Sequence, residues 1–435
     1  MKSLIKQFQF HKFSFSYISF EKFYITLIIF GIPLNLYKNR FYDNSWTIGE
    51  WLISYGGGFV RRGLLGEIIY YLSSKFFISP ILIVWLISFI SLLLLIILVL
   101  NFCKNYFEKS FLLSQIIILA PISGDYFVRK DSFLILLYGL CLLAFKGYYV
   151  KDISKITCIF LVNIFSIVAI LSHESFGIWG LPSLFLIIYL FERLEKKNIF
   201  KSILFSILIF IPSIISFILC WIFKGNLDQS ILIHNSWQSL KDILPTLGAL
   251  NLSNPSGAIA AIGWGTSQVY TNTLLSQFNL FIFWHPGAWL LTIFCVIRLF
   301  IGKYKNIYQS SKRFVVCFQL IAFLPMFLFV DIGRWIFMWI TSSALLFSFF
   351  IQVFGIQNIQ FQIQRFKGRK FIEKLIPRFS SLKNYNLVLL FLGIPHCCWS
   401  VGRYLVSNPI GFAVKNIIFY FRILFNLQAL SLIHI

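Results

Sequence analysis

Charge is what this sequence has least of. Only 12% of its 435 residues are charged, and Asp and Glu together number 15 against 38 Lys and Arg. Because a soluble domain carries about 25% charged residues, this composition excludes an ordinary soluble protein. Apolar residues make up 58% of the chain. Uncharged runs such as Ser79–Leu100, Ser202–Phe223 and Thr273–Ile297 reach the roughly 20 residues that a membrane-spanning helix needs. The sequence therefore predicts an all-α, polytopic membrane protein.

Several common functional motifs are also missing. The chain has no H-x-x-x-H, no G-x-x-x-x-G-K-[ST] and no G-x-G-x-x-G. Its eight cysteines show neither metal-ligand spacing nor a disulfide framework, and we expect them to be buried apolar side chains. We predict no metal site from these residues, while a divalent cation stays open as a cofactor. The net charge of +23 is typical of nucleic-acid binding, but the basic residues cluster between apolar runs, so we predict no nucleic-acid partner.

The apolar runs divide the chain into about twelve predicted spans, with a range of about 10 to 13 because two runs are short for a full crossing. The two short runs, the third and fourth, are tilted, re-entrant or parts of one broken element. The predicted spans are Phe23–Tyr37, Ser79–Asn101, Phe111–Ser123, Ser132–Phe145, Ile156–Leu171, Phe176–Phe191, Ser202–Phe223, Gln277–Ile297, Phe314–Val330, Trp335–Phe354, Tyr385–Gly402 and Pro409–Phe425.

Lys and Arg concentrate in alternate loops, which sets the predicted orientation. Basic loops lie on the cytoplasmic side of membrane proteins, so both termini are predicted to be cytoplasmic. We expect residues 1–435 to form a single integral membrane domain. Two long loops, 38–78 and 224–276, then lie on the outer face and form the predicted active-site face. Long loops inside a compact protein are usually functional or disordered, and the tryptophans of the second loop favour order.

The first outer loop contains the most unusual stretch, Tyr55-Gly56-Gly57-Gly58-Phe59-Val60-Arg61-Arg62-Gly63. Glycines such as Gly57 and Gly58 let a ligand approach the backbone closely, and adjacent arginines offer planar donors to phosphate or carboxylate. The apolar stretch that follows, Leu64–Leu72, is suited to lie flat on a bilayer. The stretch predicts either a site for a lipid-linked phosphate, with Arg61 and Arg62 as its anion clamp, or a loop whose arginines only contact lipid headgroups.

The remaining unusual polar residues fall on the same predicted face. Acids and arginines at helix ends near a bilayer are costly and usually mark a site. Asp331 and Arg334 are spaced to pair on one helix face. Asp125 and Arg129 are four residues apart and can pair in the same way. His173-Glu174 forms a tight turn between two runs, which also suits a helix cap.

This layout resembles the membrane-embedded, polyprenyl-dependent glycosyltransferases of the GT-C class and the bacterial O-antigen and oligosaccharide repeat-unit polymerases. The likeness rests on the cytoplasmic N-terminus, one helix, an outer loop with acids and an amphipathic segment, and then many helices with outer-face arginines. The GT-C class often carries an Asp-x-Asp or Glu-x-Asp pair in that loop, where this chain has Asp43-Asn44-Ser45. The resemblance implies a catalytic base in the loop, and Asp43, Glu50 and Glu174 compete for that role.

The resemblance also implies outer-face arginines that bind the phosphate of the donor, which match Arg61, Arg62, Arg129 and Arg334, the last with Asp331 as its pair. We therefore predict a glycosyltransferase of the bacterial cytoplasmic (inner) membrane. It would take a polyprenyl-phosphate-linked saccharide on the non-cytoplasmic face, among membrane lipid, for single-sugar transfer or repeat-unit polymerisation in cell-surface polysaccharide or glycoconjugate synthesis. The alternative is a transporter or flippase of lipid-linked sugars. A third interpretation is an inactive subunit that binds polysaccharide-assembly proteins.

Overall fold

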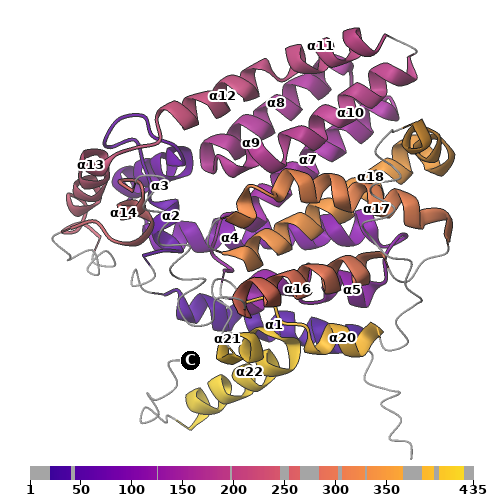
Figure 1. Ribbon diagram of the computed structural model, residues 1–435. Coiled ribbons are helices and arrows are strands. Elements are labelled where there is room, and N and C mark those ends of the chain that lie inside the picture. The colour runs from indigo at the N-terminus through magenta and orange to yellow at the C-terminus, as the bar shows by residue number, and fades with distance from the viewer. Residues whose placement is uncertain are drawn as a thin grey trace, which may run out of the picture.

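The computed structural model describes residues 20–40, 45–124, 126–195, 198–244, 254–264, 284–301, 306–328, 331–365, 385–395 and 401–425. Across these ranges the regular structure is helical, and no strand occurs among them. The helices lie side by side as a bundle (Figure 1). The predicted all-α class is therefore confirmed for the described part of the chain.

Six helical segments are long and apolar enough to cross a membrane. A bent pair of helices, α11 (Ile199–Ile209) and α12 (Ile211–Ile222), raises the number to seven if the pair is one span. These segments make the chain a multi-pass membrane protein. The predicted total of about twelve spans and the cytoplasmic termini stay predictions. The six segments are α1 (Phe20–Lys38), α4 (Pro80–Cys103), α7 (Asp131–Tyr149), α8 (Lys155–Ser172), Ser175–Leu194 and Ile332–Gly355.

The centre of the bundle is formed by α7 and by α18 (Ile332–Arg365). Helix α7 packs against α4, α8 and α18, and α18 packs in turn against α17 (Asn306–Phe323). The first turns of α18 are buried on every side, as expected for a helix surrounded by other helices. Peripheral helices complete the bundle: α16 (Trp284–Ile301), α20 (Tyr385–Phe391), α21 (Val401–Ser407) and α22 (Pro409–Leu424).

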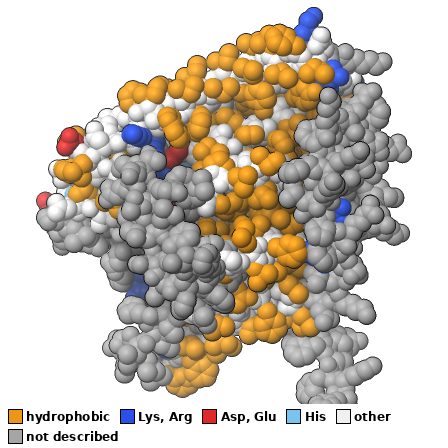
Figure 2. Space-filling model, in the orientation of Figure 1, with side chains coloured by type: hydrophobic (Ala, Val, Ile, Leu, Met, Phe, Trp, Pro, Cys, Tyr) orange, Lys and Arg blue, Asp and Glu red, His pale blue; other side chains and the backbone are white. Residues whose placement is uncertain are grey.

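Apolar side chains also cover the outside of the bundle. Helices α4, α11 and α12 expose many large Ile, Leu and Phe side chains. Figure 2 shows these hydrophobic side chains as a broad surface that extends along the upper edge, where Figure 1 places α11 and α12. An apolar surface of this size on a protein is expected to contact another apolar phase, here the hydrocarbon of a bilayer.

Several predicted spans are interrupted, and two of them show how. The run Ser202–Phe223 bends by 60° between α11 and α12, because Pro212 at the start of α12 has no N–H group and its ring disfavours a continuous helix. Asn163 of α8 stabilises the break: its side-chain amide donates to the carbonyl of Ile209 at 3.0 Å. The run Phe111–Ser123 is two short buried helices, α5 (Lys109–Leu113) and α6 (Leu119–Ser123). Broken helices are tolerated at membrane depth when protein surrounds them.

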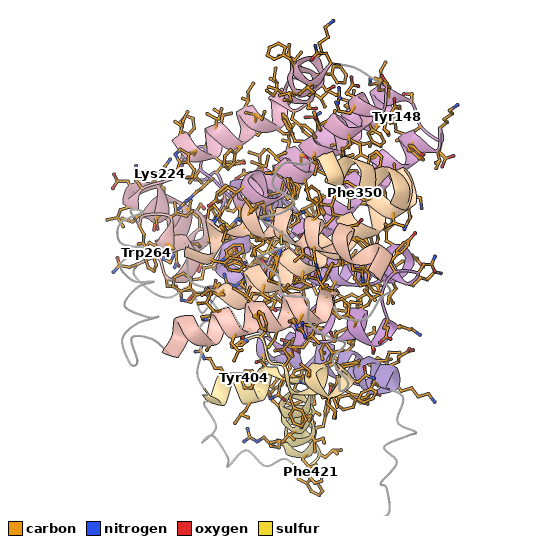
Figure 3. All side chains as sticks on the ribbon, turned by 45° about the vertical axis from the view of Figure 1, so that its right-hand side comes forward. Tyr148, Lys224, Trp264, Phe350, Tyr404 and Phe421 are labelled. Atoms are coloured by element: carbon orange, nitrogen blue, oxygen red, sulfur yellow. The ribbon has the colours of Figure 1, made fainter. Side chains whose placement is uncertain are left out.

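Short helices gather at one end of the bundle, at the left of Figure 1. They are α2 (Ile48–Trp51), α3 (Gly63–Phe76), α13 (Leu227–Gln238) and α14 (Gly257–Ala261). The indole N–H of Trp237 donates to the carbonyl of Leu52 at 2.7 Å, and the Trp46 and Trp264 rings meet edge to face. The described parts of loops 38–78 and 224–276 therefore pack against each other. Figure 3 shows Lys224 and Trp264 at this end, and Tyr148 at the opposite end.

Candidate functional site

A cluster of ionisable side chains lies at the end of the bundle that carries the short helices. We call it the charged cluster. It draws its members from five separate stretches of the chain, and three of these lie where long helices begin or end. Its members are Glu50 of α2, Arg61 and Arg62 before α3, Arg129, Lys130 and Asp131 at the start of α7, His173 and Glu174 between α8 and α9 (Ser175–Trp179), and Asp331 and Arg334 at the start of α18.

The outer part of the cluster joins two arginines to one carboxylate. Arg62 donates Nε to Glu174 Oε2 at 2.8 Å and Nη2 to Glu174 Oε1 at 2.6 Å, the bidentate geometry typical of strong arginine pairs. Arg61 donates Nη1 to Glu174 Oε1 at 3.3 Å. Both arginine side chains keep 24% exposure, against 12% for Glu174. One carboxylate thus holds two guanidinium groups that remain open to the surroundings.

The backbone before α3 orients these arginines. Arg62 has a left-handed conformation, φ 68°, which is costly for a residue with a Cβ. The backbone N–H of Arg61 donates to the carbonyl of Phe223, just after α12, at 2.9 Å. Gly57 lies against α13, where a Cβ would come within 2.9 Å of the Gln229 carbonyl oxygen, and Gly58 has φ 92°. Gly57 therefore allows α13 to pack closely on this turn, and Gly58 allows the backbone conformation that the turn requires.

Glu50 is the centre of the inner part, with an exposure of only 1%. Its Oε2 lies 3.3 Å from Nη1 of Arg129 and 3.8 Å from Nη2 of Arg334. Its Oε1 lies 3.4 Å from Nε2 of His173. The carboxylate is thus held from three directions by side chains of α7, the α8–α9 turn and α18.

Arg334 connects the first turns of α18 and α7. It forms two hydrogen bonds of 2.6 Å to the carboxylate of Asp131, and both side chains are almost fully buried. Its Nη1 also donates to Asp331 at 2.9 Å, which is the local pair that the sequence predicts. The Asp331 carboxylate lies 3.9 Å from the Arg129 guanidinium, and its side chain keeps 19% exposure. Asp331 therefore lies at the partly exposed edge of the cluster, as Arg61 and Arg62 do.

Lys130 is the most deeply buried cation, with no exposed surface. Its Nζ donates to the carbonyls of Arg62 at 3.2 Å and Ser172 at 3.1 Å, and it faces the Trp51 ring at 5.8 Å. Burial lowers the pKa of Lys130 to about 8, although Glu50 acts to raise it. Lys130 ties the backbone that carries the outer arginines to the C-terminus of α8.

The electrostatics keep the two glutamates ionised. Burial acts to raise the pKa of Glu50, but Arg334 and Arg129 overcome it and hold that pKa far below its usual value. Burial likewise acts to raise the pKa of Glu174, and Arg62 and Arg61 lower it well below the usual range. Burial lowers the pKa of His173 to about 3, so the imidazole is neutral at physiological pH.

The charges of the cluster do not cancel. Arg61, Arg62, Arg129, Lys130 and Arg334 supply five positive charges against the four carboxylates of Glu50, Asp131, Glu174 and Asp331. With His173 neutral, one positive charge is in excess among the described residues. Because the two most exposed cations are Arg61 and Arg62, that excess favours an anion at the outer margin.

Most residues proposed from the sequence lie in this cluster. Glu50, Arg61, Arg62, Arg129, Glu174, Asp331 and Arg334 meet there, and Gly57 and Gly58 belong to the turn that precedes the arginines. Asp43 lies outside the described residues, and so does Asp125, the predicted partner of Arg129.

Three cluster members were not among the predicted site residues: Lys130, Asp131 and His173. The sequence feature that could have identified them is their position at the ends of apolar runs. Within the described ranges, no group of three or more His, Cys, Asp or Glu side chains is arranged to hold a metal ion.

Comparisons with known proteins support the membrane character of the chain. Residues 20–231 match the model of a family described as "Uncharacterised membrane protein Rv1490". The matched segment is a little under half of the chain and runs from α1 into α13. It includes Glu50, Arg61, Arg62 and Glu174 but not α18. No curated protein and no solved structure matches the chain. The match and the apolar helices agree on a multi-pass membrane protein.

Proposed function

We propose that the chain is a membrane glycosyltransferase that takes its sugar from a polyprenyl-phosphate-linked donor on the non-cytoplasmic face of a bacterial inner membrane. One observation carries the proposal: Arg61 and Arg62 are partly exposed, share a single carboxylate and belong to a cluster with an excess positive charge. A phosphate can satisfy both guanidinium groups bidentately. Nucleotide sugars and ATP are absent outside the cytoplasm, so an activated donor there has to be lipid-linked.

In the proposed reaction, the phosphate of the donor takes the place of Glu174 on Arg61 and Arg62. The acceptor hydroxyl attacks the anomeric carbon as the bond from that carbon to the phosphate oxygen breaks. The arginines stabilise the negative charge that develops on the departing polyprenyl phosphate or pyrophosphate. The product is one new glycosidic bond, and the hydroxyl proton passes to a carboxylate.

Glu174 is the described carboxylate best placed to receive that proton. Its low pKa depends on Arg62 and Arg61, so a phosphate that occupies both arginines raises the Glu174 pKa and makes it a stronger base. Glu50 is fully buried between Arg129, Arg334 and His173, which fits a positioning residue better. Asp43 is a candidate catalytic base on the basis of the sequence alone.

Lipid-linked donors test the proposal directly. Membranes with the chain and membranes without it are incubated with radiolabelled polyprenyl-phosphate sugars and polyprenyl-pyrophosphate oligosaccharides. We expect label to move into an acceptor or into longer chains only when the chain is present. The pair Arg61→Gln and Arg62→Gln should reduce that transfer by on the order of 10²–10³-fold.

Lys75→Gln is the matched control, since Lys75 is an exposed cation on α3 whose ammonium group donates to the Tyr71 hydroxyl. Transfer at the wild-type rate by the double arginine variant would refute the proposal. Movement of lipid-linked sugar across vesicles that contain no acceptor, without any transfer, would favour a flippase instead.

A further inference from the structure

Helix α12 presents an apolar face to the outside of the bundle. Ile215, Ile218, Leu219 and Ile222 are all exposed, and their spacing places them on one side of the helix. Ser213 and Cys220 on the other side are fully buried against the bundle. Figure 2 shows hydrophobic side chains along this part of the surface.

The position of this face is fixed by the bend before α12. Asn163 donates to the carbonyl of Ile209 at 3.0 Å and accepts from the hydroxyl of Ser213 at 3.0 Å. The two hydrogen bonds hold both sides of the break to α8. Since His173 directly follows the last residue of α8, the same helix positions the face of α12 and one side of the charged cluster.

The apolar face ends where the outer arginines begin. The carbonyl of Phe223 accepts from the backbone N–H of Arg61, and the Phe223 ring meets the Phe59 ring edge to face at 5.5 Å. The next residue, Lys224, is exposed, and Figure 3 shows it at the end of α12. A third cation, Lys224, therefore directly follows the residue whose carbonyl accepts the backbone hydrogen bond of Arg61. The arrangement joins a lipid-facing hydrocarbon surface directly to a group of positive charges.

We propose that this surface binds one polyprenyl-phosphate lipid: Lys224, Arg61 and Arg62 bind the phosphate, and the isoprenoid chain lies along Ile215, Ile218, Leu219 and Ile222. The substrate therefore reaches the charged cluster sideways from the bilayer. This inference rests on the proposed function for the class of lipid. Because apolar surface gains little free energy on leaving one hydrocarbon phase for another, the charges provide the affinity and α12 sets the direction of the chain.

Photo-crosslinking from single positions tests the path of the lipid without any need for activity. The full chain, with a benzophenone amino acid at Ile222, is placed in nanodiscs of zwitterionic phospholipid with a trace of radiolabelled polyprenyl phosphate. The matched control carries the same amino acid at Leu208, which is exposed on α11 of the same bent pair. We expect about fivefold more labelled product at Ile222. Polyprenol, which lacks the phosphate, should label both positions equally.

Charge variants complete the test. Lys224→Gln should reduce the Ile222 product about fivefold, the effect of roughly 1 kcal/mol expected from one exposed charge. Lys201→Gln, which removes an exposed lysine on α11, should leave the product unchanged. Equal labelling at Ile222 and Leu208 would overturn the inference. So would loss of the difference in excess anionic phospholipid, which would indicate a general lipid surface. Preferential labelling without sugar transfer would retain the lipid site and refute the transferase.

Discussion

The histidine between the two glutamates predicts how stability depends on pH. The backbone N–H of Ser175 donates to Nδ1 of His173 at 3.2 Å, so Nδ1 is an acceptor and the hydrogen is on Nε2, which lies 3.4 Å from Glu50. Protonation of Nδ1 would place two donors against each other. The neutral tautomer is therefore built into the fold, in agreement with a His173 pKa of about 3.

The size of the effect follows from linkage. An unfolded histidine has a pKa of about 6.5, so below that pH the unfolded chain binds a proton that the folded chain does not. The free energy of unfolding then falls by about 1.4 kcal/mol per pH unit, or about 2 kcal/mol between pH 7.5 and pH 5. The glutamates with lowered pKa values lose their contribution only near and below the unfolded pKa of about 4.5. Lys130, whose pKa is lowered to about 8, contributes near the upper end of the window, so the effect of His173 is the difference between wild type and a variant that lacks only this histidine.

The assay compares wild type with His173→Gln, whose amide keeps a donor for Glu50 and an acceptor for Ser175. Both proteins are unfolded in detergent at a series of pH values from 7.5 to 5, by heat or by increasing SDS. We expect wild type to lose about 2 kcal/mol relative to the variant across this range. If the two stabilities change in parallel with pH, His173 is not held neutral and the tautomer assignment is wrong.

Three further predictions concern the same region. Asp131→Asn should destabilise the fold by about 3–5 kcal/mol, since it leaves the buried guanidinium of Arg334 without its closest carboxylate. As a control, Glu21→Gln removes the exposed ion pair with Lys109 and should cost under about 1 kcal/mol in the same unfolding assay. Gly66→Ala should cost about 1–3 kcal/mol in that assay, because α3 packs on the 51–53 backbone there, whereas Gly147→Ala has room and should be neutral or stabilising. Glu174→Gln should raise equilibrium binding of labelled polyprenyl phosphate about tenfold while it lowers sugar transfer, because the arginines lose their internal anion.

The sequence predicted which charged residues would lie close together better than it predicted their partners. Charged side chains avoid the middle of a bilayer, so acids and arginines between apolar runs have to lie near the ends of the helices. That argument placed Arg62, Glu174 and Arg334 on one face. Among the ion pairs of the described residues in this cluster, Asp331–Arg334, three residues apart, is the one that could be derived locally. The pairs of Arg62 with Glu174 and of Arg334 with Asp131 depend on which helices pack together, which periodicity does not determine.

The interrupted helices show a second limit of sequence reasoning. Hydropathy over Ser202–Phe223 is continuous, and only Pro212 indicates the bend, because a proline disfavours the helix before it. The residue that stabilises the bend, Asn163, lies in another helix, and in the sequence it is one polar residue within an apolar run. Its role depends on tertiary contact with Ile209, so hydropathy could not assign it.

The energetic cost of the charged cluster is itself an argument for function. Each buried ion pays a desolvation penalty that its partners only partly offset, and apolar residues of similar volume often stabilise a fold as well or better. A chain that needed only to join α7, α8 and α18 could do so with leucines, as it does elsewhere in the bundle. Here it instead gathers five cations and four carboxylates, and leaves the two arginines with the most exposure beside the lipid-facing end of α12. Such an arrangement is understandable if an anion from the membrane completes it.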